Sequence, residues 1–342
     1  MAYQSQSRRM TRMTLDDASI KLSVVIPCFN EAGNIPSLLR RIDLALEQVS
    51  GIEFEILLVD DASTDATSDL VESWGNSNPH VGYLRFVRNF GQQSALLAGI
   101  EHARGDAVIV MDADLQHPPE LIPEMIEHWR GGFDVVQALR EGQPGLTKSL
   151  SSRMFYKVLN CMSEVPVQDG ATEFRLMSRR AVDALLAMPE RSRFLRGLVA
   201  WLGFPCATIP FMAPPRNAGK TAYSPRKMMA LAEEGIISLS SKPLHLALYV
   251  AILTLFSALL YGFYVSGQYL RGASLVRGWT STIFLILLLG SANLFCSGIL
   301  GLYLSAVLTE IRRRPTYVVS QFTPATQSQR WPRTSHEPSP IY

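Results

Sequence analysis

The sequence predicts an α/β domain with a parallel sheet, followed by an amphipathic helix at a membrane surface and two transmembrane α-helices. Short apolar runs alternate with helix-like segments in the first half, and two long stretches of the second half carry no charge. Of the 342 residues, 47% are hydrophobic and only 18% are charged, as expected for a membrane-attached chain. The predicted parts are a disordered tail over 1–20, the α/β domain over 21–224, an interfacial amphipathic helix over 225–243, transmembrane helices over 244–266 and 279–308, and a cytosolic tail over 315–342.

Five apolar runs are typical of buried strands. They lie at Leu22–Pro27, Phe54–Val59, Val81–Val87, Ala107–Met111 and Asp134–Leu139. Helices are expected between them, over 35–49, from a cap at Asp65 to 74, from 93 to 103, and after Pro118-Pro119. Such alternation favours parallel strands covered by helices on both faces, and ligands of such sheets bind beyond the carboxyl ends of the strands.

Polar residues follow four of these strands, so we expect them to meet at that edge. They are Asn30 and Glu31, Asp60 and Asp61, Arg88, and the pair Asp112 and Asp114. Because Asp112 and Asp114 are two residues apart at a strand end, both side chains are expected on one face. Two carboxylates suit Mg²⁺ or Mn²⁺ that stays bound to a substrate's phosphates, and Gln116 offers a further neutral oxygen. Solvation of a loop is the alternative explanation of an isolated acidic pair.

Other features narrow the function class. The sequence contains no glycine-rich dinucleotide or P-loop motif, which leaves a metal to carry a diphosphate. A net charge of +2 gives no general reason to expect nucleic acid as a partner. The four cysteines are scattered, which predicts reduced thiols and no zinc site. The polar first twenty residues lack a signal-peptide core, so the soluble part is expected in the cytosol.

Four motifs stand in the order seen in family 2 glycosyltransferases. They are Val-Ile-Pro-Cys-Phe-Asn-Glu at 25–31, Val-Asp-Asp-Ala-Ser-Thr-Asp at 59–65, Arg-Asn-Phe-Gly at 88–91 and Asp-Ala-Asp-Leu-Gln at 112–116. Over residues 21–318 the chain resembles the polyprenyl-phosphate glycosyltransferases, which include bactoprenol glucosyltransferases and dolichol-phosphate mannosyltransferases. The resemblance implies a GT-A (Rossmann-like) nucleotide-sugar domain, a divalent metal, inversion at the anomeric carbon and a lipid-phosphate acceptor.

The resemblance also implies roles for individual residues. Donor binding is expected of Pro27, Asn30, Glu31, Asp60, Asp61, Arg88, Asn89, Gln92 and Asp112. The metal, Mg²⁺ or Mn²⁺, is expected between Asp112, Asp114 and Gln116.

Relatives carry a further carboxylate that is discussed as the catalytic base. Asp169 and Glu173 both fit its place, and with Asp114 they form the predicted catalytic set. Glu173 departs from the pattern, since the most similar relatives often have aspartate there. A phosphate monoester is already largely anionic at neutral pH, so orienting neighbouring groups is an alternative role for this carboxylate.

Cations after this point are candidate contacts for the acceptor phosphate. They are Arg175, Arg193, Arg196, Arg216, Lys220, Arg226 and Lys227. Cations interleaved with apolar residues over 191–196 suit a membrane-surface phosphate, although a solvated helix face is an equally good explanation. In the loop 214–223, Arg216 matches the relatives, but Ala222 replaces their usual lysine and Lys220 lies two places earlier.

Two uncharged stretches, Leu244–Val265 and Trp279–Leu308, are long enough to span a membrane. Their flanking cations favour cytosolic termini. In the second, Asn293, Ser297, Gly301 and Ser305 recur every four residues and predict close helix contact, either with the first span or in a homo-oligomer. A Gln-x-x-Arg-Trp pattern at 327–331 matches processive polysaccharide synthases, but it falls in a predicted disordered tail and is interpreted as chance.

The sequence therefore predicts an integral protein of the inner (cytoplasmic) membrane with its catalytic domain and both termini in the cytosol. The expected reaction moves one sugar, with a UDP-glucose-like donor favoured, to undecaprenyl or a similar polyprenyl phosphate. Two other functions stay open: a processive polysaccharide synthase, and a non-catalytic membrane sensor of nucleotide sugars.

Overall fold

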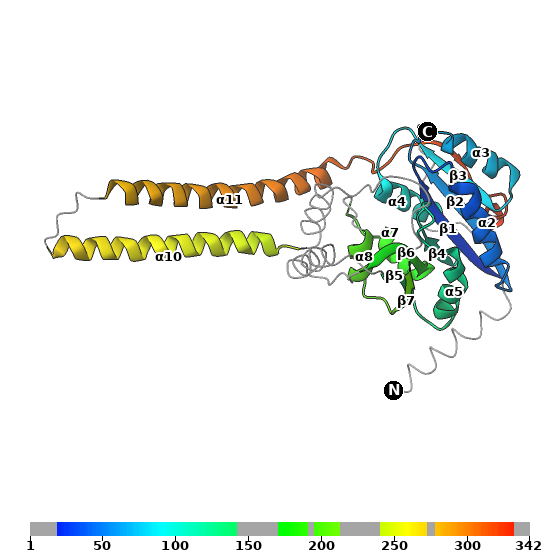
Figure 1. Ribbon diagram of the computed structural model, residues 1–342, viewed down its shortest axis with the longest axis horizontal. Helices are drawn as coiled ribbons and strands as arrows, with labels where there is room; N and C mark the ends of the chain where they lie inside the picture. Colours follow the sequence, from blue (N-terminus) through cyan, green and yellow to red (C-terminus); the bar gives the residue numbers. More distant parts are fainter. Residues whose placement is uncertain (1–18, 142–169, 191–194, 213–239, 272–277, 332–342) are drawn as a thin grey trace, which may run out of the picture. The chain divides into compact units, whose positions relative to one another are not determined.

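The computed structural model describes residues 19–141, 170–190, 195–212, 240–271 and 278–331 (Figure 1). The chain divides into two compact units. The described part of the sheet domain comprises 19–141, 170–190, 195–212 and 315–331, and that of the helical unit comprises 240–271 and 278–314.

The sheet domain is built on eight strands in the order β7-β5-β6-β4-β1-β2-β3-β8. Five of them confirm the predicted apolar runs: β1 (Ile20–Cys28), β2 (Ile52–Asp60), β3 (Val81–Phe86), β4 (Ala107–Val110) and β5 (Val135–Glu141). The other three, β6 (Ala171–Ser178), β7 (Cys206–Met212) and β8 (Val319–Thr323), were not predicted. β6 runs antiparallel to β4 and β5, and β8 runs antiparallel to β3, so the expectation of a wholly parallel sheet is wrong.

Helices cover both faces of this sheet, as predicted (Figure 1). They are α2 (Ile35–Leu46), α3 (Thr67–Ser77), α4 (Gln92–His102), the 3₁₀ turn η1 (Pro119–Leu121), α5 (Ile122–Arg130), α7 (Arg179–Leu186) and α8 (Leu195–Trp201). Asp65 acts at the start of α3, where its carboxylate accepts a hydrogen bond from the Thr67 N–H at 3.0 Å. Helix α2 ends three residues before the predicted 49.

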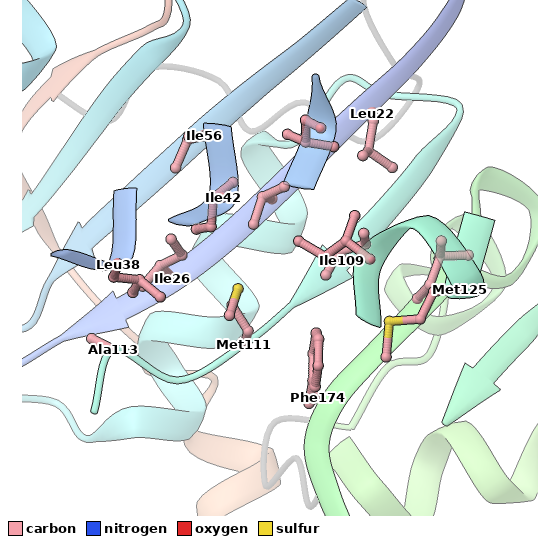
Figure 2. Close-up of a cluster of buried hydrophobic side chains, with 14 of the residues drawn as sticks. Leu22, Ile26, Leu38, Ile42, Ile56, Ile109, Met111, Ala113, Met125 and Phe174 are labelled. Atoms are coloured by element: carbon pink, nitrogen blue, oxygen red, sulfur yellow. The ribbon is translucent and has the colours of Figure 1, made fainter. Parts of the chain in front are cut away.

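Side chains of β1 alternate between the two helical layers. Ile26 lies on one face in a core with Leu38 and Ile42 of α2 (Figure 2). Val25 lies on the other face, where α4 approaches so closely that a Cβ on Gly99 would be 2.2 Å from Val25 Cγ1. Since all of these apolar side chains are withdrawn from water, the core holds the strand ends, and hence the loops beyond them, in one arrangement.

The prediction of disorder after residue 315 is wrong for residues 315–331, whereas the predicted tail over 1–20 lies outside the described residues except at its last two positions. Ile20 already belongs to β1 and pairs with Ile52. After residue 315 the chain forms β8 and the 3₁₀ turn η2 (Ser328–Arg330). Trp331 is 4% exposed and its Nε1 donates to Glu53 Oε2 at 3.0 Å. The open edge of β3 offers unpaired backbone groups, and β8 satisfies them although its composition is polar.

The described part of the helical unit consists of α10 (Lys242–Leu270) and α11 (Trp279–Arg312) with the residues that flank them. Both are long and apolar enough to cross a membrane. As helices, each extends beyond its predicted range. They pack together, since Tyr303 Oη donates to the Ser240 carbonyl at 2.6 Å and Cys296 Sγ approaches the Ala247 carbonyl at 3.3 Å. Most of their described apolar side chains remain exposed in this chain. The predicted interfacial helix over 225–243 lies mostly outside the described residues.

Candidate active site

The loops after β1 and β2 are tied together by their own polar groups. Asn30 has a left-handed backbone (φ 57°), its N–H donates to Ser63 Oγ at 3.0 Å, and its Oδ1 accepts from the Thr64 N–H at 2.9 Å. Asp60 is 1% exposed and accepts from the Ser63 N–H and from Ser68 Oγ at 2.9 and 2.6 Å. Asp60 therefore shapes the loop, whereas the exposed Asn30 side chain borders the edge where a ligand would bind.

Asp61 connects this loop to the one after β3. Its two carboxylate oxygens accept the N–H groups of Phe90 and Gly91 at 2.6 and 2.9 Å. Burial raises the pKa of Asp61 above its usual range, and the two N–H donors oppose that shift. Gly91 has φ 95°, a conformation that side-chain-bearing residues avoid, so glycine allows the second N–H to reach the carboxylate.

The neighbouring predicted donor residues are placed as follows. Pro27 is buried within β1, and the Glu31 N–H donates to Thr67 Oγ1 at 2.8 Å. Arg88 and Asn89 are exposed, and the Arg88 guanidinium lies 4.1 Å from the centre of the Phe90 ring.

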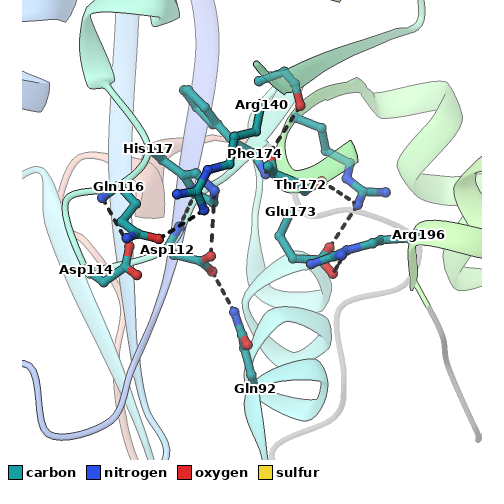
Figure 3. Close-up of polar contacts among 12 residues, drawn as sticks. Gln92, Asp112, Asp114, Gln116, His117, Arg140, Thr172, Glu173, Phe174 and Arg196 are labelled. Carbon is teal, nitrogen blue, oxygen red and sulfur yellow. Dashed lines mark hydrogen bonds and ion pairs between the residues drawn. The ribbon is translucent and has the colours of Figure 1, made fainter. Parts of the chain in front are cut away.

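Asp112 follows β4 and is surrounded by polar groups from three elements (Figure 3). Its Oδ1 accepts from Gln92 Nε2 at 2.6 Å, and its backbone N–H donates to His117 Nδ1 at 2.9 Å. Burial, together with the charges of Glu173 and Asp114, raises the pKa of Asp112 to about 7. This side chain therefore lies in a field of negative charge that a cation would relieve.

His117 was not among the predicted site residues. Its ring is 5% exposed and stacks on Phe174 with ring centres 5.3 Å apart. Burial lowers the pKa of His117 to about 4, so the ring is neutral near pH 7. Since Nδ1 accepts a hydrogen bond, the ring hydrogen lies on Nε2, which is 3.7 Å from Asp112 Oδ2. His117 therefore supports the position of Asp112.

Asp114 and Gln116 lie in the same loop. Asp114 Oδ1 accepts from the Gln116 N–H at 3.1 Å, and the intervening Leu115 has φ 61°. Gln116 Oε1 faces Arg140 NH1 at 3.4 Å (Figure 3). Sequence reasoning overlooked Arg140, although its position at the end of the fifth apolar run places it at the same sheet edge. The structure thus adds one exposed cation beside the predicted metal ligands.

Glu173 forms a charge cluster with two arginines from the second half of the predicted site. Its carboxylate accepts from Arg175 NH2 at 2.8 Å, from Arg196 Nε at 2.6 Å and from Gln93 Nε2 at 3.2 Å. Burial would raise the pKa of Glu173, but Arg196 and Arg175 outweigh it and the net shift is downward. A carboxylate stabilised in this way is a weak base, and the geometry favours the orienting role over the catalytic one.

Arg175 departs from the prediction that it contacts an acceptor phosphate. Its side chain is 3% exposed and is used to hold Glu173. The Arg196 side chain is 24% exposed and comes from the first turn of α8. The remaining predicted residues Asp169, Arg193, Arg216, Lys220, Arg226 and Lys227 lie outside the described residues.

Asp112 and Asp114 suit a divalent cation by their chemistry. Two carboxylates and the raised pKa of Asp112 fit a hard cation that keeps open positions for other oxygen ligands. In the described part of the chain, no group of three or more His, Cys, Asp and Glu residues is arranged to hold a metal alone. A cation here would complete its shell with oxygens from Gln116, water or a bound phosphate.

Comparison with known proteins relates this edge to an enzyme family. Residues 23–186 match the family described as "Glycosyl transferase family 2". The uncharacterized glycosyltransferase YkcC of Bacillus subtilis (strain 168) is 37% identical over 88% of this chain and 94% of its own length. The chain belongs to glycosyltransferase family 2. The predicted family and enzyme class are therefore confirmed.

Other relatives of this glycosyltransferase include the bactoprenol glucosyl transferase of Shigella phage SfII, which is 36% identical over 88% of this chain and 98% of the relative. Among solved structures, mannosyl-3-phosphoglycerate synthase from Rubrobacter xylanophilus matches with a TM-score of 0.45 and 17% identity, over 67% of this chain and 74% of that chain. The mixed sheet of this glycosyltransferase, with polar loops at the carboxyl ends of β1, β2, β3 and β4, agrees with the GT-A fold expected from its motifs.

Proposed function

We propose that the enzyme transfers one sugar, with inversion, from a nucleoside diphosphate sugar to undecaprenyl or another polyprenyl phosphate. The observation that carries the proposal is the meeting of Asp112 and Asp114 with the cationic cluster around Glu173 at one sheet edge (Figure 3). Relatives named bactoprenol glucosyl transferases, similar over 88% of this chain, support the lipid acceptor and a UDP-glucose-like donor.

The loops after β1, β2 and β3 would hold the donor. Asn30, Glu31 and Asp61 border the place for the nucleoside, and the N–H groups of Phe90 and Gly91 keep Asp61 oriented. Asp112, Asp114 and Gln116 would hold Mg²⁺ or Mn²⁺ next to the diphosphate. When bound, that cation neutralises the charge that develops on the departing diphosphate. Arg140, beside Gln116, adds positive charge at the same place.

Of the two predicted acceptor contacts that the structure describes, Arg196 keeps an accessible side chain and Arg175 is buried, so we assign the acceptor phosphate to Arg196. Glu173 holds its Nε at 2.6 Å, which restricts the guanidinium, and the side chain keeps 24% of its surface exposed. An acceptor phosphate that is already anionic needs no strong base to attack the anomeric carbon. Glu173 then acts by orienting Arg196, and Asp169 remains the alternative carboxylate.

We propose that α10 and α11 span the inner membrane with the sheet domain and both termini in the cytosol, where nucleotide sugars are available. Exposed apolar side chains over both helices support lipid contact. The small and polar positions of α11 at Asn293, Ser297, Gly301 and Ser305 would allow a homo-oligomer. A Cβ at Gly301 would meet no atom within 4 Å, so this part of the helix has room for another helix.

The geometry disfavours a processive synthase. Trp331 of the Gln-x-x-Arg-Trp pattern is ordered, but it bonds Glu53 at the start of β2. Asp112 lies past the end of β4, which is parallel to β1 and β2, so the pattern lies at the opposite edge of the sheet. A non-catalytic sensor remains the second alternative, and a turnover assay separates it from an enzyme.

The test uses the full chain in detergent with undecaprenyl phosphate, Mg²⁺ or Mn²⁺, and UDP- and GDP-sugars offered one at a time. Lipid products are identified by mass. We expect one donor to add a single sugar, and Asp112→Asn and Asp114→Asn to lose activity by at least about a hundredfold. Asp106→Asn is the matched control, because this exposed aspartate precedes β4 at the other end of the same strand, where its carboxylate accepts from the Lys21 N–H at 2.9 Å.

Each alternative has its own outcome. Repeated addition of sugar to one lipid would establish a processive enzyme. Donor binding without any lipid product, across the whole panel, would favour the sensor. Full activity of both aspartate variants, or activity that survives removal of divalent cations by a chelator, would exclude the proposed metal site.

A further inference from the structure

The segment 315–331 braces the loop 88–91, whose Phe90 and Gly91 N–H groups donate hydrogen bonds to Asp61. The β3–β8 pairing shifts its register between Arg85 and Phe86, at the end of β3. Directly beyond the shift, the Val87 N–H donates to the Val318 carbonyl at 3.1 Å. Ser320 Oγ donates to the Arg85 carbonyl at 3.0 Å. The backbone entering the 88–91 loop is therefore bonded to a segment more than two hundred residues later in the chain.

Aromatic rings continue this contact toward the loop. Tyr317 is 8% exposed and stacks on Phe86 with ring centres 5.1 Å apart and planes 16° apart. Phe86 in turn meets Phe90 edge-on at 5.7 Å. The Tyr317 hydroxyl donates to the carboxylate of Glu101 in α4, which holds the ring from its other end. Tyr317 thus lies one ring away from Phe90, whose N–H donates to Asp61 at 2.6 Å.

We infer that Tyr317 is a positioning residue for the nucleotide donor. Through Phe86 it sets the place of Phe90, and thereby the orientation of the Asp61 carboxylate. This inference rests on the proposed donor role of Asp61. α11 ends at Arg312, so Tyr317 follows the second apolar helix after only five residues.

The first experiment compares donor binding and kinetics in the full chain in detergent. Loss of the stacked ring in Tyr317→Ala is expected to raise the KM and Kd of the donor about tenfold and to change kcat little. Tyr317→Phe keeps the ring and should bind the donor nearly as the unchanged enzyme does. Phe322→Ala is the matched control, since Phe322 is an aromatic residue of β8 that contacts His102 instead of the loop. It should leave the donor KM unchanged.

The second measurement does not depend on the donor. Hydrogen exchange of the Phe90 and Gly91 amides should be faster in Tyr317→Ala than in Phe322→Ala, while amides of β1 exchange alike in both. If Tyr317→Ala does not fold, Tyr317→Leu keeps most of the side-chain volume without the aromatic face and is expected to show the same changes.

The outcomes separate this inference from the proposed function. If Asp61→Asn binds the donor normally, the donor role of Asp61 fails, and the exchange data alone decide whether Tyr317 positions the loop. If Asp61→Asn weakens binding but the Tyr317 variants behave like Phe322→Ala in both measurements, Tyr317 only stabilises the strand and the inference is overturned.

Discussion

Replacing Glu173 with glutamine removes the carboxylate that pairs with Arg175 and Arg196 at 2.8 and 2.6 Å. The side chains of Glu173 and Arg175 are each 3% exposed, so the variant leaves a buried guanidinium without its counter-charge. Removal of one partner of a buried ion pair costs about 3–5 kcal/mol. For a domain of this size class, each kcal/mol lowers the midpoint of thermal unfolding by about 2–4 °C. Glu173→Gln should therefore lower that midpoint by about 6–20 °C.

The same substitution at Glu120 is the matched control. Arg41 and Glu120 are also 2.8 Å apart, but their side chains are 31% and 57% exposed. Exposed pairs contribute about 0–1 kcal/mol, so Glu120→Gln should lower the midpoint by less than about 4 °C. The Arg175–Glu173 and Arg41–Glu120 distances are equal, so the two variants differ in burial and in the second arginine, Arg196, that Glu173 also holds.

The assay is thermal unfolding of the full chain in detergent, followed by tryptophan fluorescence near neutral pH at low and high salt. Salt should weaken the exposed pair more than the buried one. A double variant, Glu173→Leu with Arg175→Met, removes both buried charges and should recover much of the lost stability. Equal shifts for the Glu173 and Glu120 variants, or no recovery in the double variant, would refute the assignment of a buried charge cluster.

Three further predictions follow from individual contacts. Trp331→Ala should destabilise the chain by about 3–5 kcal/mol, because the ring is buried. The folded variant should still add one sugar to the lipid, and loss of that transfer would contradict the placement of Trp331 far from the site. Gly82→Ala should lower the free energy of unfolding by about 1–3 kcal/mol, because the new Cβ would lie 2.7 Å from the Ala325 backbone nitrogen. Protease cleavage within 315–331 should become faster, and an unchanged rate would count against packing of this segment on β3. The pKa of Glu173 is lower in the folded chain, so the stabilisation from its charge is present above the unfolded pKa of about 4.3 and is lost as pH falls through the folded value. The difference in unfolding free energy between the unchanged chain and Glu173→Gln should therefore shrink on acidification. A constant difference would contradict the lowered pKa.

Local pattern in the sequence was enough to predict the strands that carry the site. An apolar run such as Ala107–Val110 predicts a buried strand, and a polar residue just after it is then expected at the end of that strand. Parallel strands bring such ends together whatever their order, so the meeting of Asp61 and Asp112 near one edge follows from β1, β2 and β4 alone. The two uncharged stretches likewise predict long helices by length and composition.

The tertiary structure alone decided which groups are partners. The segment Val319–Thr323 has the mixed polarity of an edge strand, and it is ordered because β3, more than two hundred residues earlier, presents an open edge. Whether Arg175 faces a substrate or a buried carboxylate depends on strand direction, and β6 runs antiparallel to its neighbours. Sequence pattern reports how far each residue is withdrawn from water. The identity of its neighbour is set by strand order and long-range packing, which is why Tyr317 and His117 became candidates only in the folded chain.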